Sequence, residues 1–284
     1  MHWRKVLLWT LSAAILTAPV YLSGINVTAA PIMQENKTEA DKIKEEKKEP
    51  VSGYEEEFQK NNEKVSETMK NKKVSRTAQN ESCGETATWA LDNGVLTISG
   101  TGAIADYSDT SEIPWKDQKK TITKIVIENG ITEIGVQAFY DCTNVTEVVF
   151  PDTLTTIKRG AFFQCYSLEA AMLPDGVTTL EQGAFAKCSS MMQYSGKGVT
   201  SYGRFVFQDT ALTSFEIPKG VTDIESLVFL NCGIEEYTLA EGNETYMVKD
   251  GILFSKSGDE LVIYPAEKKD ETYQIPEGCT KTAD

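Results

Sequence analysis

The chain has 284 residues and carries 28 Lys+Arg against 42 Asp+Glu, which gives a formal net charge of −14. A chain of this length can bury one or two hydrophobic cores. Its acidic balance excludes DNA or RNA as the main partner, because phosphate binding requires a basic face. The excess is local: residues 81–284 hold 31 acidic and 15 basic side chains, so this part of the chain is expected to present an acidic surface.

Residues 1–30 have the pattern of a secretory signal peptide. Basic residues precede the apolar run 6–22, and small residues lead to a cleavage site after Ala29 or Ala30. The alternative is an uncleaved anchor, since the run approaches membrane-spanning length. Either route predicts a secreted or cell-surface protein, whose only membrane contact would be this segment if it stays uncleaved. Cleavage would also remove His2, the single histidine, which excludes Ser-His-Asp catalysis and His-ligated metal sites; no cofactor is expected.

Residues 31–80 form a charged stretch with eleven basic and eleven acidic side chains. Its apolar residues are too sparse to offset the entropy of ordering a core, so a flexible linker is predicted. Ser52 and Glu55 have capping-box spacing, and apolar residues follow near helical intervals. A transient helix over 52–70, or a stable helix that binds a partner, is the alternative for that part.

From residue 123 the sequence repeats every 22–23 residues. Each unit carries Ala or Val, then Phe, and three residues later Cys or, once, Thr; aliphatic or Tyr side chains precede the Phe at fixed spacing. Tandem similarity at this period indicates a solenoid, in which each copy is one coil stacked on the next. The residues expected to form the buried ladder are Phe139, Phe162, Phe185, Phe207, Phe229, Cys142, Cys165, Cys188 and Cys232.

One stretch of each unit predicts a β-strand. In the second copy Glu147 and Val149 alternate with Val148 and Phe150, and Pro151 ends the run. Because side chains alternate across a strand, the first pair should point outward and the second into the core. The fold predicted is a β-rich solenoid with one parallel strand per coil. The Ala-Phe-x-x-Cys stretch should lie opposite, as a tight turn or short helix.

The repeat unit V-x-x-I-x-x-x-A-F-x-x-C-x-x-L-x-x-V-x-I-P resembles the BspA-like class of leucine-rich repeats. Its clearest copy is 154–174, LTTIKRGAFFQCYSLEAAMLP. Residues 83–115 resemble the small β module that often precedes such repeats, and the segment from Ala240 resembles the β-hairpin insert that commonly interrupts them. The resemblance implies a leucine-rich-repeat solenoid, of the repeat α/β class, in a secreted bacterial surface protein that adheres to host or bacterial proteins.

The folded part is expected to divide into a small β cap at 81–122, the repeats at 123–239 and a hairpin insert with the start of a further repeat at 240–284. In the cap, Asp-Asn-Gly between two β-prone runs predicts a hairpin, anchored by Trp89 and Trp115.

Beyond the repeats, residues 256–259 join a second expected hairpin, and the repeat restarts with Cys279 at an aliphatic position. The sequence ends inside this repeat, which suggests either a piece of a longer protein or a frayed last turn.

The fourth unit departs from the pattern. It loses one residue between Met191 and Val199, lacks the proline after its strand, and has Tyr202 for Ile and Thr210 for Cys. The sheet is expected to be irregular there.

The six cysteines are expected to stay unbridged. Four recur at one stacked position with parallel Cβ vectors, whereas a disulfide needs the vectors turned toward each other. Cys83 and Cys279 lie in different modules, and no C-x-x-C pair supports a metal site. Buried free thiols are therefore predicted.

The outward side chains of the predicted sheet form a candidate binding face, because a solenoid presents a concave sheet built by neighbouring coils. The apolar members are expected to form a stripe with acidic residues beside it. The candidate residues are Lys124, Val126, Glu147, Val149, Ala170, Met172, Gln193, Ser214, Glu216, Glu236 and Thr238.

Three functions remain open on the sequence alone. The first is non-catalytic recognition of a host or bacterial surface protein, or of an extracellular-matrix protein, by the concave face. Such a face should be poorer in Lys and richer in aromatic or apolar side chains than the opposite face. The second is a structural spacer or scaffold within a longer surface protein. The third is a glycan-active enzyme, which would need two carboxylates in one pocket.

Overall fold

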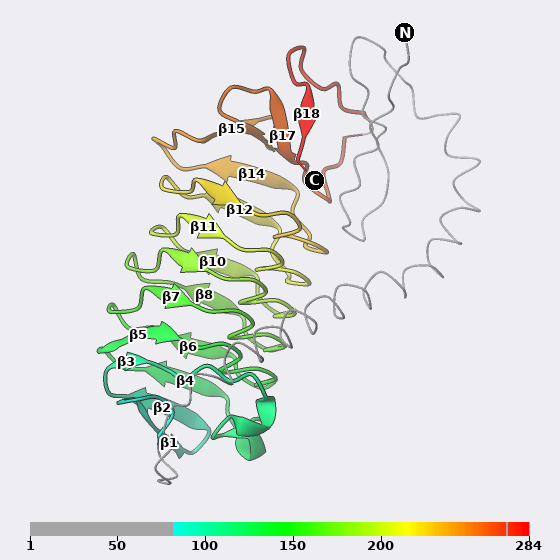
Figure 1. Ribbon diagram of the computed structural model, residues 1–284. Coiled ribbons are helices and arrows are strands. Elements are labelled where there is room, and N and C mark those ends of the chain that lie inside the picture. The colour runs from blue at the N-terminus through cyan, green and yellow to red at the C-terminus, as the bar shows by residue number, and fades with distance from the viewer. Residues whose placement is uncertain (1–81, 271, 284) are drawn as a thin grey trace, which may run out of the picture.

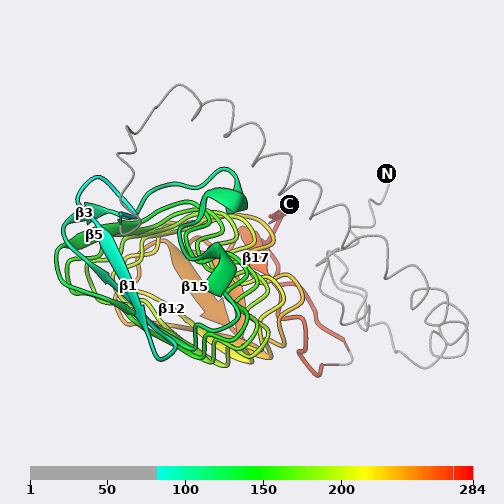
Figure 2. The same cartoon turned by 90° about the horizontal axis from the view of Figure 1, so that it is seen from below.

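The computed structural model describes residues 82–270 and 272–283. The predictions for 1–30 and 31–80, including the helix over 52–70, lie outside the described residues. The described chain winds into a stack of coils that rises from β1 to β18 (Figure 1). Viewed along the stack, successive coils superpose on one another (Figure 2). The predicted β-rich solenoid is confirmed.

One side of the stack carries the longer strands, which we call the long-strand row. Its neighbours pair in parallel from β2 to β6, from β8 to β10 and from β12 to β14. Inward positions such as Ile125, Ala171 and Phe215 are buried, as the alternation predicted. The row comprises β2 (Val95–Ser99), β4 (Lys124–Ile127), β6 (Glu147–Val149), β8 (Ala170–Met172), β10 (Gln193–Ser195), β12 (Ser214–Ile217) and β14 (Glu236–Leu239).

A second row of short strands forms a six-stranded parallel sheet. The prediction of one strand per coil was wrong in this respect, because each repeat coil contributes a second strand of two to four residues. The inner residue of these strands, for example Ile157 or Leu180, is buried. The row comprises β3 (Gly102–Ala103), β5 (Ile131–Ile134), β7 (Thr156–Ile157), β9 (Thr179–Leu180), β11 (Ser201–Tyr202) and β13 (Asp223–Ile224).

The Ala-Phe-x-x-Cys stretch forms a tight turn rather than a helix. The described residues contain no α-helix, only the 3-10 helices η1 (Thr110–Glu112) and η2 (Lys116–Gln118). Each turn has two residues with left-handed backbone, two positions before and two after its Phe. Gly fills the first position in two coils at no steric cost. The ten residues are Gln137, Asp141, Gly160, Gln164, Gly183, Lys187, Phe205, Asp209, Leu227 and Asn231, with φ between 55 and 64°.

The phenylalanine rings stack from coil to coil through the core. The centroids of Phe139 and Phe162 are 5.1 Å apart, and those of Phe162 and Phe185 are 5.2 Å apart. The next steps, to Phe207 and Phe229, measure 6.2 and 5.7 Å. Offset stacking at these distances adds to the burial of the rings themselves.

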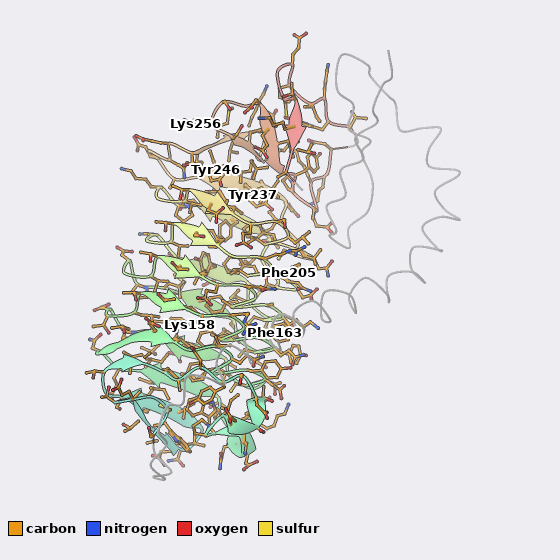
Figure 3. The ribbon with its side chains drawn as sticks, viewed as in Figure 1. Lys158, Phe163, Phe205, Tyr237, Tyr246 and Lys256 are labelled. Carbon is orange, nitrogen blue, oxygen red and sulfur yellow. The ribbon has the colours of Figure 1, made fainter. Side chains whose placement is uncertain are left out.

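The backbone follows the same register as the rings. The N–H of Phe139 donates to the carbonyl of Ala161 at 2.8 Å, and Phe162 donates to Ala184 in the same way. Phe163, directly after Phe162, and Phe205, two residues before Phe207, lie on one side of the stack (Figure 3). Each turn is therefore fixed to the next by its backbone as well as by its ring.

The stack begins one step earlier than the sequence analysis placed it. The indole of Trp115 stacks on Phe139 at 5.4 Å and its Nε1 donates to the carbonyl of Ala138 at 3.1 Å. Trp89 packs edge-on against Trp115 at 5.9 Å. Trp115 thus occupies the ring position of a first coil, which ties the N-terminal segment to the repeats.

All six cysteines are free and buried, as predicted. The thiol of Cys165 donates to the carbonyl of Phe139, and that of Cys188 to Phe162, each at 3.3 Å. Burial raises the pKa of the Cys142 thiol to about 12 and that of Cys232 to about 11. The thiols therefore act as small neutral core groups that bind the neighbouring coil.

The predicted N-terminal hairpin is present. β1 (Thr88–Asp92) pairs antiparallel with β2 through a two-residue turn, Asn93-Gly94, in which both residues have positive φ. β2 and β3 then join the two rows of the repeats directly. On the outside, Lys158 lies 2.9 Å from Glu133 and 3.4 Å from Asp106, which links the two parts further. The role of this segment as a cap stays a prediction.

A four-stranded sheet, β15 to β18, follows the last long strand of the repeats. The predicted hairpin of β16 (Ile252–Ser255) and β17 (Glu260–Ile263) is present, and an additional strand, β15 (Tyr246–Lys249), pairs with β16. β18 (Lys281–Thr282) follows Cys279 and pairs in parallel with β17. Tyr237 and Tyr246 are buried where the last repeat meets this sheet (Figure 3).

Asn243 fastens the chain between the last repeat and β15. Its side chain is buried, and its Nδ2 donates to the carbonyls of Pro218 at 2.8 Å and Val221 at 3.3 Å. Its Oδ1 accepts from the backbone N–H groups of Thr245 and Tyr246 at 2.9 and 2.8 Å. All four hydrogen-bonding positions of the amide are used.

The irregularity predicted for the fourth unit is also present. Within the described residues no ladder joins β10 to β12. The space is filled by aromatic side chains: Tyr194 stacks on Phe215 at 5.3 Å, and the hydroxyls of Tyr194 and Tyr202 lie 3.1 Å apart. A Cβ on Gly196 would lie 2.0 Å from the Tyr194 hydroxyl, so any larger residue would require the Tyr194 side chain to move.

Replacing Phe162 by Ala should remove the central ring of the stack and lower the free energy of unfolding by about 3–5 kcal/mol. Urea denaturation followed by circular dichroism measures the change. Tyr166, which is 39% exposed, provides the control, since its replacement by Ala should cost less than about 1 kcal/mol. Equal losses in the two variants would contradict the role given to the stack.

The cysteines should be unreactive toward a thiol reagent at about pH 8 in the folded protein, and all should react once guanidinium chloride unfolds it. The folded-state pKa values lie above the ordinary value of 9.0. The stability that these neutral thiols contribute is therefore complete below about pH 9 and is lost as the pH rises toward 11. A thiol that reacts rapidly in the folded protein would contradict this assignment.

Candidate binding face

The eleven candidate residues all lie on the outward side of the long-strand row. Lys124 is opposite Glu147, and Val126 is opposite Val149, across the β4–β6 pair. Ala170 is opposite Gln193 across the β8–β10 pair. Met172 belongs to the same row, and Ser214, Glu216, Glu236 and Thr238 complete it on β12 and β14. We call this surface the long-strand face.

The ladder of the row is interrupted between β6 and β8, although the N–H of Glu169 donates to the carbonyl of Thr146 at 3.4 Å just before the two strands. Among the described residues, β6 pairs only with β4 and β8 only with β10, so no ladder joins the two strands. A groove of about 450 Å³ lies at this interruption. The break coincides with Phe150, whose ring packs edge-on against Phe162 where neighbouring coils have aliphatic side chains. The groove is lined by Thr146, Glu147, Val148, Glu169, Ala170 and Met172.

Three large apolar side chains are exposed on or directly before strands β6, β8 and β10, and Met172 among them lines the groove. Met172 is 59% exposed, Val149 39% and Met192, at the entrance to β10, 65%. Among the described residues, Tyr166, in a turn, is the remaining large hydrophobic with comparable exposure. Apolar groups that are exposed next to one another, rather than singly, are typical of interaction sites.

The charges of the face are mostly acidic. Lys124 forms an ion pair with Glu147 at 2.8 Å, with both side chains partly exposed. Glu169, Glu216 and Glu236 are exposed, and the described residues provide no ion-pair partner for them. The face therefore combines uncompensated carboxylates with exposed thioether and aliphatic groups.

Two residues of this site were missed by the sequence analysis. Glu169 and Met192 directly precede β8 and β10 and were left out because only the alternating strand positions were counted. They follow Thr146 at successive intervals of 23 residues, so the repeat register could have identified them. The expected enrichment in aromatic side chains is not seen on the row itself, where Val and Met supply the apolar surface.

The described residues hold no group of three or more His, Cys, Asp or Glu side chains that could bind a metal ion. They also include no helix long and apolar enough to cross a membrane.

Comparison with known sequence families gives a match over residues 117–235, in six copies, to the BspA type leucine rich repeat region. These residues are BspA-type leucine-rich repeats. The repeat pattern in the sequence predicted five copies from residue 123, and the match begins earlier, just after Trp115. No curated protein matches the chain.

Three solved structures have the same fold. A leucine-rich repeat protein from Eubacterium ventriosum is 25% identical, with a TM-score of 0.58 over 71% of this chain and 55% of its own. The pneumococcal vaccine antigen PcpA is 18% identical, with a TM-score of 0.55 over 72% and 60%. A leucine-rich cell surface protein from Faecalibacterium prausnitzii is 23% identical, with a TM-score of 0.50 over 72% and 66%. The chain thus spans about three fifths of the length of these three proteins.

Hydrogen peroxide should oxidise Met172 and Met192 well before Met191. The side chains of Met172 and Met192 are exposed, whereas that of Met191 is fully buried in the core. Oxidation rate follows access to the sulfur. Peptide mass spectrometry over a time course measures the order, and equal rates for Met191 and Met192 would contradict the described exposure of the face.

Proposed function

We propose that the chain is a non-catalytic binding protein that uses the long-strand face to recognise another protein outside the cell. The observation that carries this proposal is the exposure of Val149, Met172 and Met192 on or directly before the strands β6, β8 and β10 of one face. Single exposed apolar side chains are common on protein surfaces, whereas several on one face are typical of a surface that a partner covers.

The family supports the extracellular part of the proposal. The F. prausnitzii structure is that of a cell surface protein, and PcpA is a vaccine antigen. Together with the signal-peptide pattern at 1–30, these relatives favour display at the surface or secretion. The proposed partner class is a surface protein of the host or of another bacterium, or an extracellular-matrix protein, and the proposed role is adhesion.

The full chain, immobilised, should capture at least one purified extracellular-matrix or bacterial surface protein, measured by surface plasmon resonance. Charge reversal at Glu147, Glu216 and Glu236, each to Lys, should reduce capture by tenfold or more, because like charges across an interface are destabilising.

The matched control reverses three exposed carboxylates outside the row, Asp117, Glu244 and Glu277, to Lys. It changes the net charge equally and should leave capture unchanged. If the two triple variants behave alike, or if the face variant binds as well as the parent, recognition does not use this face.

A further inference from the structure

The groove between β6 and β8 has an apolar side and an acidic rim. Val148, Ala170 and Met172 supply the apolar part of its lining, and Glu147 and Glu169 supply carboxylates from successive coils. Its volume of about 450 Å³ falls within the range of pockets that bind small groups.

We propose that this groove seats a lysine or arginine side chain from an extended basic segment of the partner protein. The assignment rests on the proposed function and specifies the chemistry of the partner. The aliphatic stem of the basic side chain would lie along Met172 and Val148, and its charged head would reach Glu169.

The apolar lining suits such a stem. Lysine and arginine carry long methylene chains that bury well against hydrophobic surface while the charge stays near water. Met172 is unbranched and 59% exposed, so its thioether can adapt to the stem that covers it. A lining made only of charged side chains would not stabilise buried methylene groups.

The exposed carboxylates favour a positively charged group on the partner. Glu169 has no ion-pair partner among the described residues, while Glu147 already binds Lys124 at 2.8 Å. A cationic head in the groove would compensate Glu169 without breaking the existing pair. Glu216 and Glu236 continue the acidic surface along the row, so further basic residues of an extended segment would be attracted there.

The same charges argue against other occupants. Residues 81–284 carry 31 acidic against 15 basic side chains, so a second copy of this chain would be repelled. The outward positions of the row include no aromatic ring on which a sugar could stack. An anionic ligand would meet two carboxylates in the groove.

The test uses the full chain with carbon-13-labelled methionine methyl groups, observed by NMR. The probes are three capped heptapeptides, Gly-Ser-Leu-X-Leu-Ser-Gly, in which X is Lys, Arg or Gln. The Lys and Arg peptides should shift the Met172 methyl resonance and leave buried Met191 unmoved. The Gln peptide should bind about fivefold more weakly, the equivalent of one partly exposed charge pair.

Glu169→Gln should weaken binding of the Lys peptide by a similar factor. Glu216→Gln, on the same face but outside the groove, should change the affinity for this peptide less than twofold. The preference for Lys should fall as salt is raised, because the rim carboxylates are exposed. An equal response to the Lys and Gln peptides, or equal losses in the two variants, would overturn the assignment.

The result is separable from the proposed function. Loss of protein capture in the Glu147, Glu216 and Glu236 variant together with no peptide effect at Met172 would leave the face as the binding surface and reject the basic anchor. If peptide binding depends on Glu169 but charge reversal at Glu147, Glu216 and Glu236 leaves protein capture unaffected, the basic site stands and the proposed use of the whole face is rejected.

Discussion

The spacing between coils is the constraint on which the rest of the structure depends. Parallel strands pair at about 4.8 Å, and rings stacked in the same direction must keep nearly the same distance. Phe139, Phe162 and Phe185 meet this requirement at 5.1 and 5.2 Å, while the backbone N–H of each turn bonds to the next coil. Because ring and backbone impose one period, outward side chains recur at matching positions on successive coils.

The fourth unit, which is one residue shorter, shows what happens where the regular spacing between coils is not kept. The ring separation rises to 6.2 Å between Phe185 and Phe207, and the long-strand row opens between β10 and β12. The short-strand row nevertheless stays continuous from β9 through β11 to β13. The change in length is therefore absorbed on one side of the stack, and Tyr194 and Tyr202 fill the space with a buried pair of hydroxyls.

The sequence predicted the stack because two distinctive residue types, Phe and Cys, recur at a fixed interval. It did not predict the short strands, since two residues such as Thr156–Ile157 have no alternation to detect. The groove was missed for a different reason. Its position depends on how Phe150 packs beneath the sheet and how far β6 and β8 separate, which no local pattern records. The eleven candidate residues lie on the strands of the long-strand row, and their role in binding stays a prediction. Glu169 and Met192 were added because the structure shows where β8 and β10 begin.

The unbridged cysteines have a consequence for where such a protein can work. Cohesion between coils comes from ring stacking, backbone bonds and neutral thiols, so it owes nothing to oxidation. A small exported domain held by disulfides depends on an oxidising compartment to mature and loses stability in a reducing one. This solenoid needs neither an oxidant to fold nor protection from reductants afterwards. The same structure is therefore available in aerated and in oxygen-free surroundings.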